Sequence, residues 1–192
     1  PTALTATPAG ANQITLSWTS TDPGAASFNV YRAVGVCPQP SYQLVATGLA
    51  TTSYLDTTVS GGLDYAYVVT AKDVTGGCES ATTLCAQAQT TGSCVEPPGF
   101  FGLESVTNAA ATTCTLDLAW SPATAYCGGS AEYSVYRSTT PGFTPGPENL
   151  IASGLGATTF SDAAGLAFGT THYYVVRATD AANGVSDANL VE

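Results

Sequence analysis

The chain has 192 residues, of which 44% are hydrophobic and only 9% charged, and 14 acidic against 4 basic side chains give a net charge of −10. This length suits two domains of about 95 residues and argues against one large enzyme core. The negative charge would repel a phosphate backbone or an anionic membrane, and no apolar run approaches the ~20 residues that cross a bilayer, so we expect no nucleic-acid partner and no membrane span.

Taken in chain order, the first clear element is a strand over residues 14–18, where Ile14, Leu16 and Trp18 alternate with polar residues. The same alternation returns over residues 65–71. A period of two is typical of a strand with one buried face. Clusters of Gly, Pro, Asn and Asp punctuate the chain, and no helical period is seen, so the pattern predicts a β-sandwich.

The chain also contains a tandem repeat. Leu16–Trp18 recurs as Leu118–Trp120, and Phe28–Arg32 recurs as Tyr133–Arg137. Three more pairs follow in the same order: 46–49 with 152–155, 52–56 with 158–162, and 67–69 with 174–176. The offset grows only from 102 residues (16 to 118) to 107 (67 to 174), so two copies of one fold are expected.

These motifs resemble the fibronectin type III domain. Each half carries, in order, a Leu-x-Trp strand, an aromatic-x-Val-Tyr-Arg strand, a Thr-x-Tyr/Phe-x-Asp strand and a Gly-x-x-Tyr/His-x-Tyr-x-Val-x-Ala strand. More narrowly, the chain is similar to the Thr/Ala-rich version found in secreted bacterial proteins beside hydrolases, adhesins or surface-layer components. The resemblance implies two tandem seven-stranded immunoglobulin-like (fibronectin type III) β-sandwiches, each with sheets A-B-E and C'-C-F-G.

The family layout places the strands and the domain boundaries. In the first copy the strands are expected at 2–7, 13–19, 27–33, 42–47, 52–57, 64–73 and 83–91. In the second copy they begin near 101, 115, 132, 149, 158, 171 and 187. Residues 1–92 and 99–192 are the expected domains, the second with a short or truncated last strand. Residues 93–98 form a linker, in which Pro97 and Pro98 favour an extended joint.

The layout also implies structural roles for four residues. Trp18 and Trp120 are expected at the centres of the two cores. Tyr65 stands at the family's tyrosine corner, where a ring packs and its polar atom ties down a neighbouring loop. His172 takes that place in the second copy, and because an imidazole is shorter than a phenol, its corner is expected to be looser.

No residue pattern predicts catalysis or a cofactor. No serine lies in a Gly-x-Ser-x-Gly motif, and a nucleophile without a base is weak at neutral pH. Four aspartates recur at equivalent positions, which favours turns over chemistry: Asp56, Asp73, Asp162 and Asp180. A calcium site is a weaker alternative, because its oxygen-bearing residues lack EF-hand spacing: Asp180, Asn183 and Asp187.

The few cations and exposed aromatics have simple interpretations. Arg32 and Arg137 occupy the same strand position in the two copies, so their stems are expected to cover the sheet with the charged heads in water. Tyr126, Phe143 and Tyr173 are candidates for a platform under a sugar ring, although single exposed aromatic side chains are common on sandwiches.

The six cysteines include no Cys-x-x-Cys pair and have no histidine nearby. This argues against zinc, iron–sulfur and haem sites and favours disulfides in an extracellular, oxidising setting. Bonded cysteines need Cα atoms within ~7 Å, and in the family layout this favours Cys78–Cys85 and Cys37–Cys94. The last pair is then Cys114–Cys127, for which residues 121–131 must fold back along the sheet, or Cys94–Cys127 forms instead.

The sequence therefore predicts a non-catalytic extracellular spacer or binding module, with no cofactor and no metal. Its expected partners are other domains of a parent protein or neighbouring copies of the same chain. The alternative is a subunit of an extracellular filament or surface layer assembled by strand pairing between chains. A third role is an accessory carbohydrate-binding module, with polysaccharide as the partner.

Overall fold

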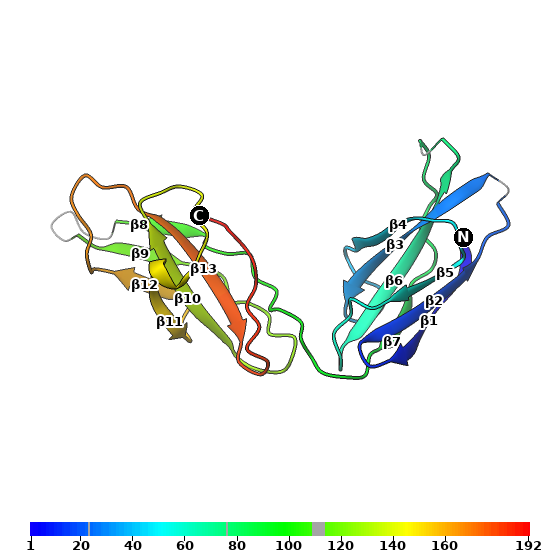
Figure 1. The fold of residues 1–192 in the computed structure, drawn as a ribbon, viewed down its shortest axis with the longest axis horizontal. Coiled ribbons are helices and arrows are strands. Elements are labelled where there is room, and N and C mark those ends of the chain that lie inside the picture. Colours follow the sequence, from blue (N-terminus) through cyan, green and yellow to red (C-terminus); the bar gives the residue numbers. More distant parts are fainter. Residues whose placement is uncertain (23, 76, 109–113) are drawn as a thin grey trace. The chain divides into compact units, whose positions relative to one another are not determined.

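The computed structural model describes residues 1–22, 24–75, 77–108 and 114–192. They divide into two compact units, Pro1–Val95 and Glu96–Glu192, called unit 1 and unit 2 below. Both units are built from strands (Figure 1). Over the described ranges, no helix has the length and apolar character needed to cross a membrane.

Unit 1 is a sandwich of two antiparallel sheets. Its described strands are β1 (Thr2–Gly10), β2 (Gln13–Thr19), β3 (Ala25–Val34), β4 (Gln43–Leu49), β5 (Ser53–Asp56), β6 (Asp64–Asp73) and β7 (Ala86–Gln89). One sheet has the order β1-β2-β5 and the other the order β4-β3-β6-β7. These are the A-B-E and C'-C-F-G sheets that the sequence predicts.

The core of unit 1 follows from the alternation along its strands. In β2, Ile14 and Leu16 are fully buried and Trp18 nearly so, while the polar residues between them face outward. The Trp18 ring meets Phe28 of the other sheet edge-on, with ring centroids 5.5 Å apart. Such a contact adds to the burial of two large apolar side chains, so the indole joins the two sheets.

Unit 2 repeats this arrangement with fewer strands among its described residues. Its described elements are β8 (Ser105–Thr107), β9 (Leu116–Ala119), β10 (Ala131–Ser138), the 3-10 turn η1 (Pro147–Asn149), β11 (Leu150–Leu155), β12 (Thr159–Asp162) and β13 (Tyr173–Asp180). The sheets have the orders β8-β9-β12 and β11-β10-β13. Trp120 is buried and packs on Tyr133 with ring centroids 5.4 Å apart.

The expected sandwich class is confirmed, and the strands predicted at 13–19 and 64–73 match β2 and β6. The last strand of each unit differs from the prediction. In unit 1, β7 is shorter than 83–91 because the side chain of Thr83 accepts from the Val69 N–H (3.0 Å), in place of a carbonyl of the ladder. In unit 2, the Asp187 side chain likewise accepts the Ala178 N–H in place of a backbone carbonyl. The described residues from 187 onward form no strand.

Candidate functional site

The most deeply buried charge of unit 1 is the carboxylate of Asp56, at the end of β5. Its Oδ2 accepts hydrogen bonds from Arg32 Nη1 on β3 (2.8 Å) and from the Tyr67 hydroxyl on β6 (2.9 Å). Its Oδ1 accepts the Thr58 N–H (2.9 Å). Burial alone would raise the pKa of Asp56, but the Thr58 N–H and the Arg32 guanidinium outweigh it, so this pKa is lowered. Burial and the Asp56 charge raise the pKa of Tyr67.

Unit 2 repeats this cluster at the equivalent positions, with Ala164 in the place of Thr58. Asp162 Oδ2 accepts from Arg137 Nη1 (2.6 Å) and from the Tyr174 hydroxyl (2.8 Å), and its Oδ1 accepts the Ala164 N–H (3.2 Å). Burial and the hydrogen bond to Asp162 raise the pKa of Tyr174. The prediction that the arginine heads stay in water is wrong, because each head pairs with a buried aspartate and the Arg32 and Arg137 side chains are only 17% and 20% exposed.

The other recurring aspartates, Asp73 and Asp180, accept backbone N–H groups, as expected for turn residues, and so does the nearby Asp187. Asp73 accepts the Cys78 N–H (3.3 Å). Asp180 accepts the N–H groups of Ala182 and Cys127, each at 2.9 Å. Asp187 accepts the N–H groups of Ala178 and Asn189. Within the described part of the chain, no group of three or more His, Cys, Asp or Glu side chains could hold a metal ion. Asp180 thus binds both the loop after β13 and the segment that carries Cys127.

A polar cluster that the sequence did not predict lies on the outer face of the larger sheet of unit 1. Glu79 Oε1 accepts from the Tyr31 hydroxyl (2.6 Å), from Asn29 Nδ2 (3.0 Å) and from the Thr70 hydroxyl. The Thr70 bond, followed by those of Tyr31 and Asn29, lowers the pKa of Glu79 to about 2. The cluster fastens the loop before β7 to the sheet. No local sequence signal marks it, because its members are far apart in the chain.

The tyrosine corner differs between the units. In unit 1 the fully buried Tyr65 places its hydroxyl 2.8 Å from the Ser60 N–H, which donates to it. In unit 2 both ring nitrogens of His172 are buried and have no hydrogen-bond partner among the described residues. His172 thus makes no bond like that of the Tyr65 hydroxyl among the described residues, and the looser corner stays a prediction.

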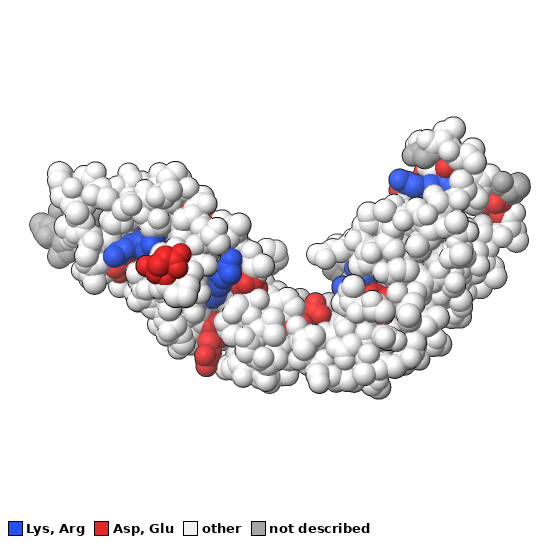
Figure 2. Space-filling model, viewed as in Figure 1, with Lys and Arg blue, Asp and Glu red and all other residues white. Residues whose placement is uncertain are grey.

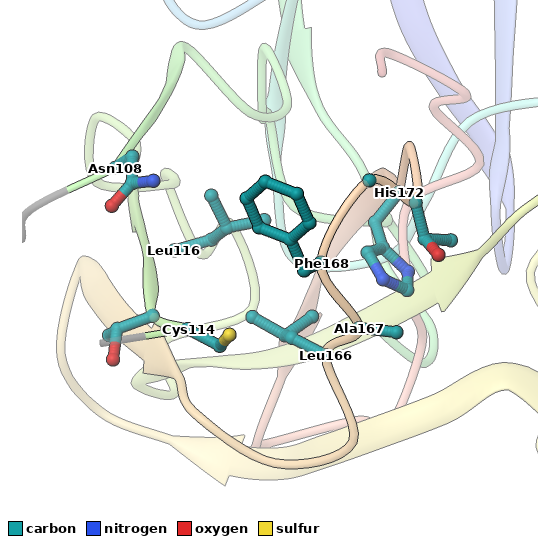
Figure 3. Close-up of a pocket in the computed structure, with 10 residues that line it drawn as sticks. Asn108, Cys114, Leu116, Leu166, Ala167, Phe168 and His172 are labelled. Atoms are coloured by element: carbon teal, nitrogen blue, oxygen red, sulfur yellow. The ribbon is translucent and has the colours of Figure 1, made fainter. Parts of the chain in front are cut away.

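His172 lies at a hollow of about 450 Å³ in unit 2. The hollow lies between the start of β9 and the loop from β12 to β13 (Figure 3). Leu116 and Leu166 give it an apolar lining, and Cys114 lies at its edge. In Figure 3 the ring of Phe168 is drawn between Leu116 and His172, and this side chain is 100% exposed.

The cysteine pairing differs from the prediction. Cys37 is bonded to Cys85, with Cα atoms 5.9 Å apart, so the pairs Cys37–Cys94 and Cys78–Cys85 are wrong. Cys37 follows β3 and Cys85 precedes β7, and both strands pair with β6 at its Tyr65–Tyr67 end, which brings the two cysteines together.

The remaining four cysteines fall into two kinds. Cys94 and Cys127 are also in the disulfide form. Cys78 and Cys114 are exposed free thiols, so the pair Cys114–Cys127 is wrong as well.

The aromatic side chains proposed as a sugar platform are only half-exposed. Tyr126, Phe143 and Tyr173 all have intermediate burial. The Tyr126 hydroxyl lies over Gly99, where an added Cβ would be only 2.7 Å from it. The most exposed aromatic side chains of the described residues are instead Phe168 and Phe101, the latter 87% exposed. Charged side chains are few and scattered over the face seen in Figure 2.

Comparison with known proteins gives relatives that are much longer than this chain. Exoglucanase B of Cellulomonas fimi is 31% identical over 192 residues, which is 97% of this chain and 15% of that protein. Chitinase A1 of Niallia circulans is 30% identical over 184 residues, 93% of this chain and 23% of that protein. No family model matches the chain. The chain is a tandem pair of fibronectin type III-like domains.

Solved structures similar to parts of these fibronectin type III-like domains were also found. A "Fn3-like protein" from Clostridium thermocellum is 36% identical, with a TM-score of 0.42, and the match covers 47% of this chain and 90% of that one. The FN1–FN3 domains of chicken CNTN1 are 12% identical, with a TM-score of 0.41, over 95% of this chain and 65% of that one.

Proposed function

We propose that this chain is a non-catalytic extracellular module that spaces or presents other domains of a longer protein. The observation that carries the proposal is the comparison with exoglucanase B, in which nearly the whole chain matches a small part of a much longer protein. The chitinase match has the same form. The partners we propose are therefore the other domains of the parent polypeptide, which by comparison with the exoglucanase and the chitinase is an enzyme that degrades a polysaccharide.

The chemistry of the buried polar groups supports a structural role. The carboxylates of Asp56 and Asp162 are each held by an arginine and a tyrosine of their own unit. General acid–base or nucleophilic catalysis needs such groups to face a substrate. The Cys37–Cys85 disulfide agrees with an extracellular location, where such bonds persist.

The proposal is tested by incubating the folded chain with chromogenic ester, peptide and glycoside substrates. We expect no turnover above that of a heat-denatured sample. Turnover that is lost on denaturation would contradict a non-catalytic module.

A carbohydrate-binding role is the second candidate, favoured by the enzymes that the chain resembles. Affinity electrophoresis in soluble glucan and chitin derivatives distinguishes it from a spacer, because a binding module is retarded and a spacer is not. Retardation that is lost in Tyr126→Ala or Tyr173→Ala would favour this candidate. The matched control is Leu84→Ala, which replaces a side chain that is 92% exposed in unit 1.

A subunit of a filament or surface layer is the third candidate, because among the described residues of unit 2 only β10 pairs with β13. An open sheet edge recruits strands from other chains. Light scattering on the native chain tests this role, since a spacer remains monomeric and a strand-paired subunit grows in mass with concentration.

A further inference from the structure

Unit 2 has another hollow, of about 460 Å³, between the edges of its two sheets. β11 is an edge strand of one sheet and β12 an edge strand of the other. The hollow is lined by Arg137 of β10, Ile151 of β11, residues 160–162 of β12 and residues 163–164 after it, and it is called the Arg137 hollow below. Its volume is in the range of small-molecule sites, which are mostly apolar and contain few polar groups.

The guanidinium of Arg137 has hydrogen-bond donors to spare. Its Nη1 donates to Asp162 Oδ2 and to the Ala164 carbonyl, each at 2.6 Å. Nε and Nη2 have no partner among the described residues, and neither atom is fully buried. Nη2 lies beside Gly165, where an added Cβ would be 3.3 Å from it. Two donors of a rigid, planar group are therefore open to a ligand.

Three positions around the Arg137 hollow have smaller side chains than their counterparts in unit 1. They are Phe160 for Tyr54, Ala164 for Thr58 and Gly165 for Val59. The alignment follows from the two aspartates of the repeat, whose Oδ1 atoms accept the N–H groups of Thr58 and Ala164. At this place unit 2 therefore lacks two hydroxyl groups and one branched apolar side chain.

In unit 1 the corresponding atoms surround Arg32. The Thr58 hydroxyl accepts from Arg32 Nη1 (2.8 Å), and Val59 is buried in the core. Burial and the Asp56 charge raise the pKa of Tyr54, and the Arg32 charge lowers it, so the Tyr54 hydroxyl lies close to this ion pair. The arginine of unit 1 is thus covered at the place where unit 2 has the hollow.

The charge around the Arg137 hollow favours an uncharged ligand. Arg137 is already paired with Asp162. Unit 2 has two arginines against nine aspartates and glutamates, so its field repels anions. A carboxylate in the hollow would add a second negative charge beside Asp162. The group that fits is therefore a neutral hydrogen-bond acceptor.

Hydrogen bonding favours a carbonyl over a hydroxyl in this place. The Asp162 carboxylate and the Ala164 carbonyl already accept from Arg137 Nη1. The Ser161 hydroxyl donates to Asp117. A ligand hydroxyl bound to the guanidinium would compete for acceptors that are in use, and an unpaired buried donor is costly. A carbonyl oxygen carries no proton and accepts from Nε and Nη2 together.

The apolar part of the lining favours a methyl group beside that carbonyl. Ile151 and Phe160 are partly buried and pack against the core of unit 2. The Ala163 and Ala164 methyl groups complete this wall. A methyl group on the carbonyl carbon gains contact with these side chains when it leaves water. A carbonyl that carries a methyl group is an acetyl group.

We infer that the Arg137 hollow binds an acetyl group carried by a sugar, with the carbonyl oxygen on Nε and Nη2 of Arg137 and the methyl group against Ile151 and Phe160. The acetyl group is assigned from the hollow, and the sugar rests on the carbohydrate-binding role proposed above as the second candidate. N-acetylated amino sugars and O-acetylated sugars share this chemistry. The hollow exceeds the size of an acetyl group, so the ring that bears it also enters.

The test is saturation-transfer NMR on the 192-residue chain with four methyl glycosides: the N-acetyl-β-glucosaminide, the 6-O-acetyl-β-glucoside, the β-glucoside and the β-glucuronide. Transfer to the acetyl methyl protons of one or both acetylated sugars is expected, and which of them binds identifies the source. The glucoside lacks the acetyl group and the glucuronide carries a carboxylate, so both are expected to bind at least 10-fold more weakly. No transfer to either acetylated sugar, or equal binding of the glucoside or the glucuronide, would overturn the assignment.

Phe160→Tyr with Ala164→Thr places the unit 1 side chains in the Arg137 hollow. We expect this variant to bind the acetylated sugar at least 10-fold more weakly and to keep the parent fold, which Trp120 fluorescence in guanidinium checks. The matched control is Phe168→Tyr with Ala167→Thr, which makes the same two chemical changes at exposed positions outside this hollow and is expected to bind as the parent does. Unchanged binding in the first variant, or loss in the control, would overturn the assigned site.

The unmodified chain gives a second readout. It has three arginines, so their Nε–H resonances are easily resolved in a nitrogen-15 spectrum. The acetylated sugar is expected to shift the Nε–H resonance of Arg137 and to leave that of Arg32 in place. An unshifted Arg137 resonance would overturn the site. Retardation in glucan or chitin gels without any of these effects would leave the carbohydrate-binding role standing and overturn this inference alone.

Discussion

Asp56 and Asp162 do the same structural work in the two units. Each carboxylate joins three strands, because it ends one strand and accepts from an arginine and a tyrosine on two strands of the other sheet. Charges are rarely buried without partners, since desolvation is costly. Two such clusters in a chain with only four basic residues mean that half of its cations serve this contact.

We expect Asp162→Ala to lower the free energy of unfolding of unit 2 by about 3 kcal/mol, the lower end of the cost of breaking a buried pair, since Arg137 is partly exposed and can rehydrate. Guanidinium unfolding followed by Trp120 fluorescence in a Trp18→Phe background measures it. The control is Glu104→Ala, an exposed carboxylate in the same unit, with an expected change within about 0.5 kcal/mol. Equal changes in both variants would contradict the role of the cluster.

Glu79 gives unit 1 a dependence on acid pH. Its pKa in the folded state is lowered to about 2, below its ordinary value of 4.5, so its contribution to stability is complete above the ordinary value and is lost as the pH falls toward 2. Glu79→Gln is therefore expected to unfold at lower denaturant than the parent at pH 6, with the difference shrinking to nothing near pH 2. Trp18 fluorescence in a Trp120→Phe background reports it. A difference that does not change with pH would contradict the ionic contribution.

At the level of elements, β7 is connected to the sheet by more than its own ladder. β7 is only four residues long. Glu79 and Thr83 lie in the segment before β7 and bind this segment to the sheet, and the Cys85 disulfide joins it to the loop after β3. The segment from 78 to 85 runs along β6 and carries Cys85 to the end of the sandwich where Cys37 lies. A short edge strand is thereby held at its beginning.

The disulfide prediction is that Cys37→Ser with Cys85→Ser lowers the free energy of unfolding of unit 1 by ~2–4 kcal/mol, because the unfolded chain regains the entropy of an open loop. Trp18 fluorescence measures the change, and Trp120 is expected to report the parent value. In the folded parent, maleimide labelling and peptide mapping are expected to find Cys78 and Cys114 and no other cysteine. Labelling of Cys85 would contradict the pairing.

The sequence was sufficient for elements with a local signal. Alternation around Trp18 predicted the strand, the family resemblance placed its bounds at those of β2, and the repeat predicted a second sandwich around Trp120. The sequence was not sufficient where a contact between residues far apart in the chain determines the structure. The Asp56–Arg32 pair joins positions whose patterns look exposed, and the Cys37–Cys85 bond depends on the path of the segment before β7. The hollow beside His172 could have been found from the Tyr-to-His change together with the short last strand.

At the scale of the whole molecule, the two sandwiches share one design but differ in the interactions that stabilise them. Unit 1 has the last strand, a completed tyrosine corner and a disulfide between its own residues. In unit 2 the described residues supply neither that strand nor a partner for the His172 nitrogens. The clusters of buried apolar residues differ in the same sense, with 11 members among the described residues of unit 1 and 8 among those of unit 2.

We therefore expect unit 2 to unfold at lower denaturant than unit 1. The two tryptophans make this measurable, since each unit holds one at its core, so Trp18→Phe and Trp120→Phe each leave a reporter for a single unit. The Trp120 transition is expected first in guanidinium, and a ligand that binds only folded unit 2 should move that transition upward and leave the Trp18 transition in place. If Trp18 reported the earlier transition, the missing strand and the open corner of unit 2 would not limit its stability, because the unit with fewer supports would then be the more stable one.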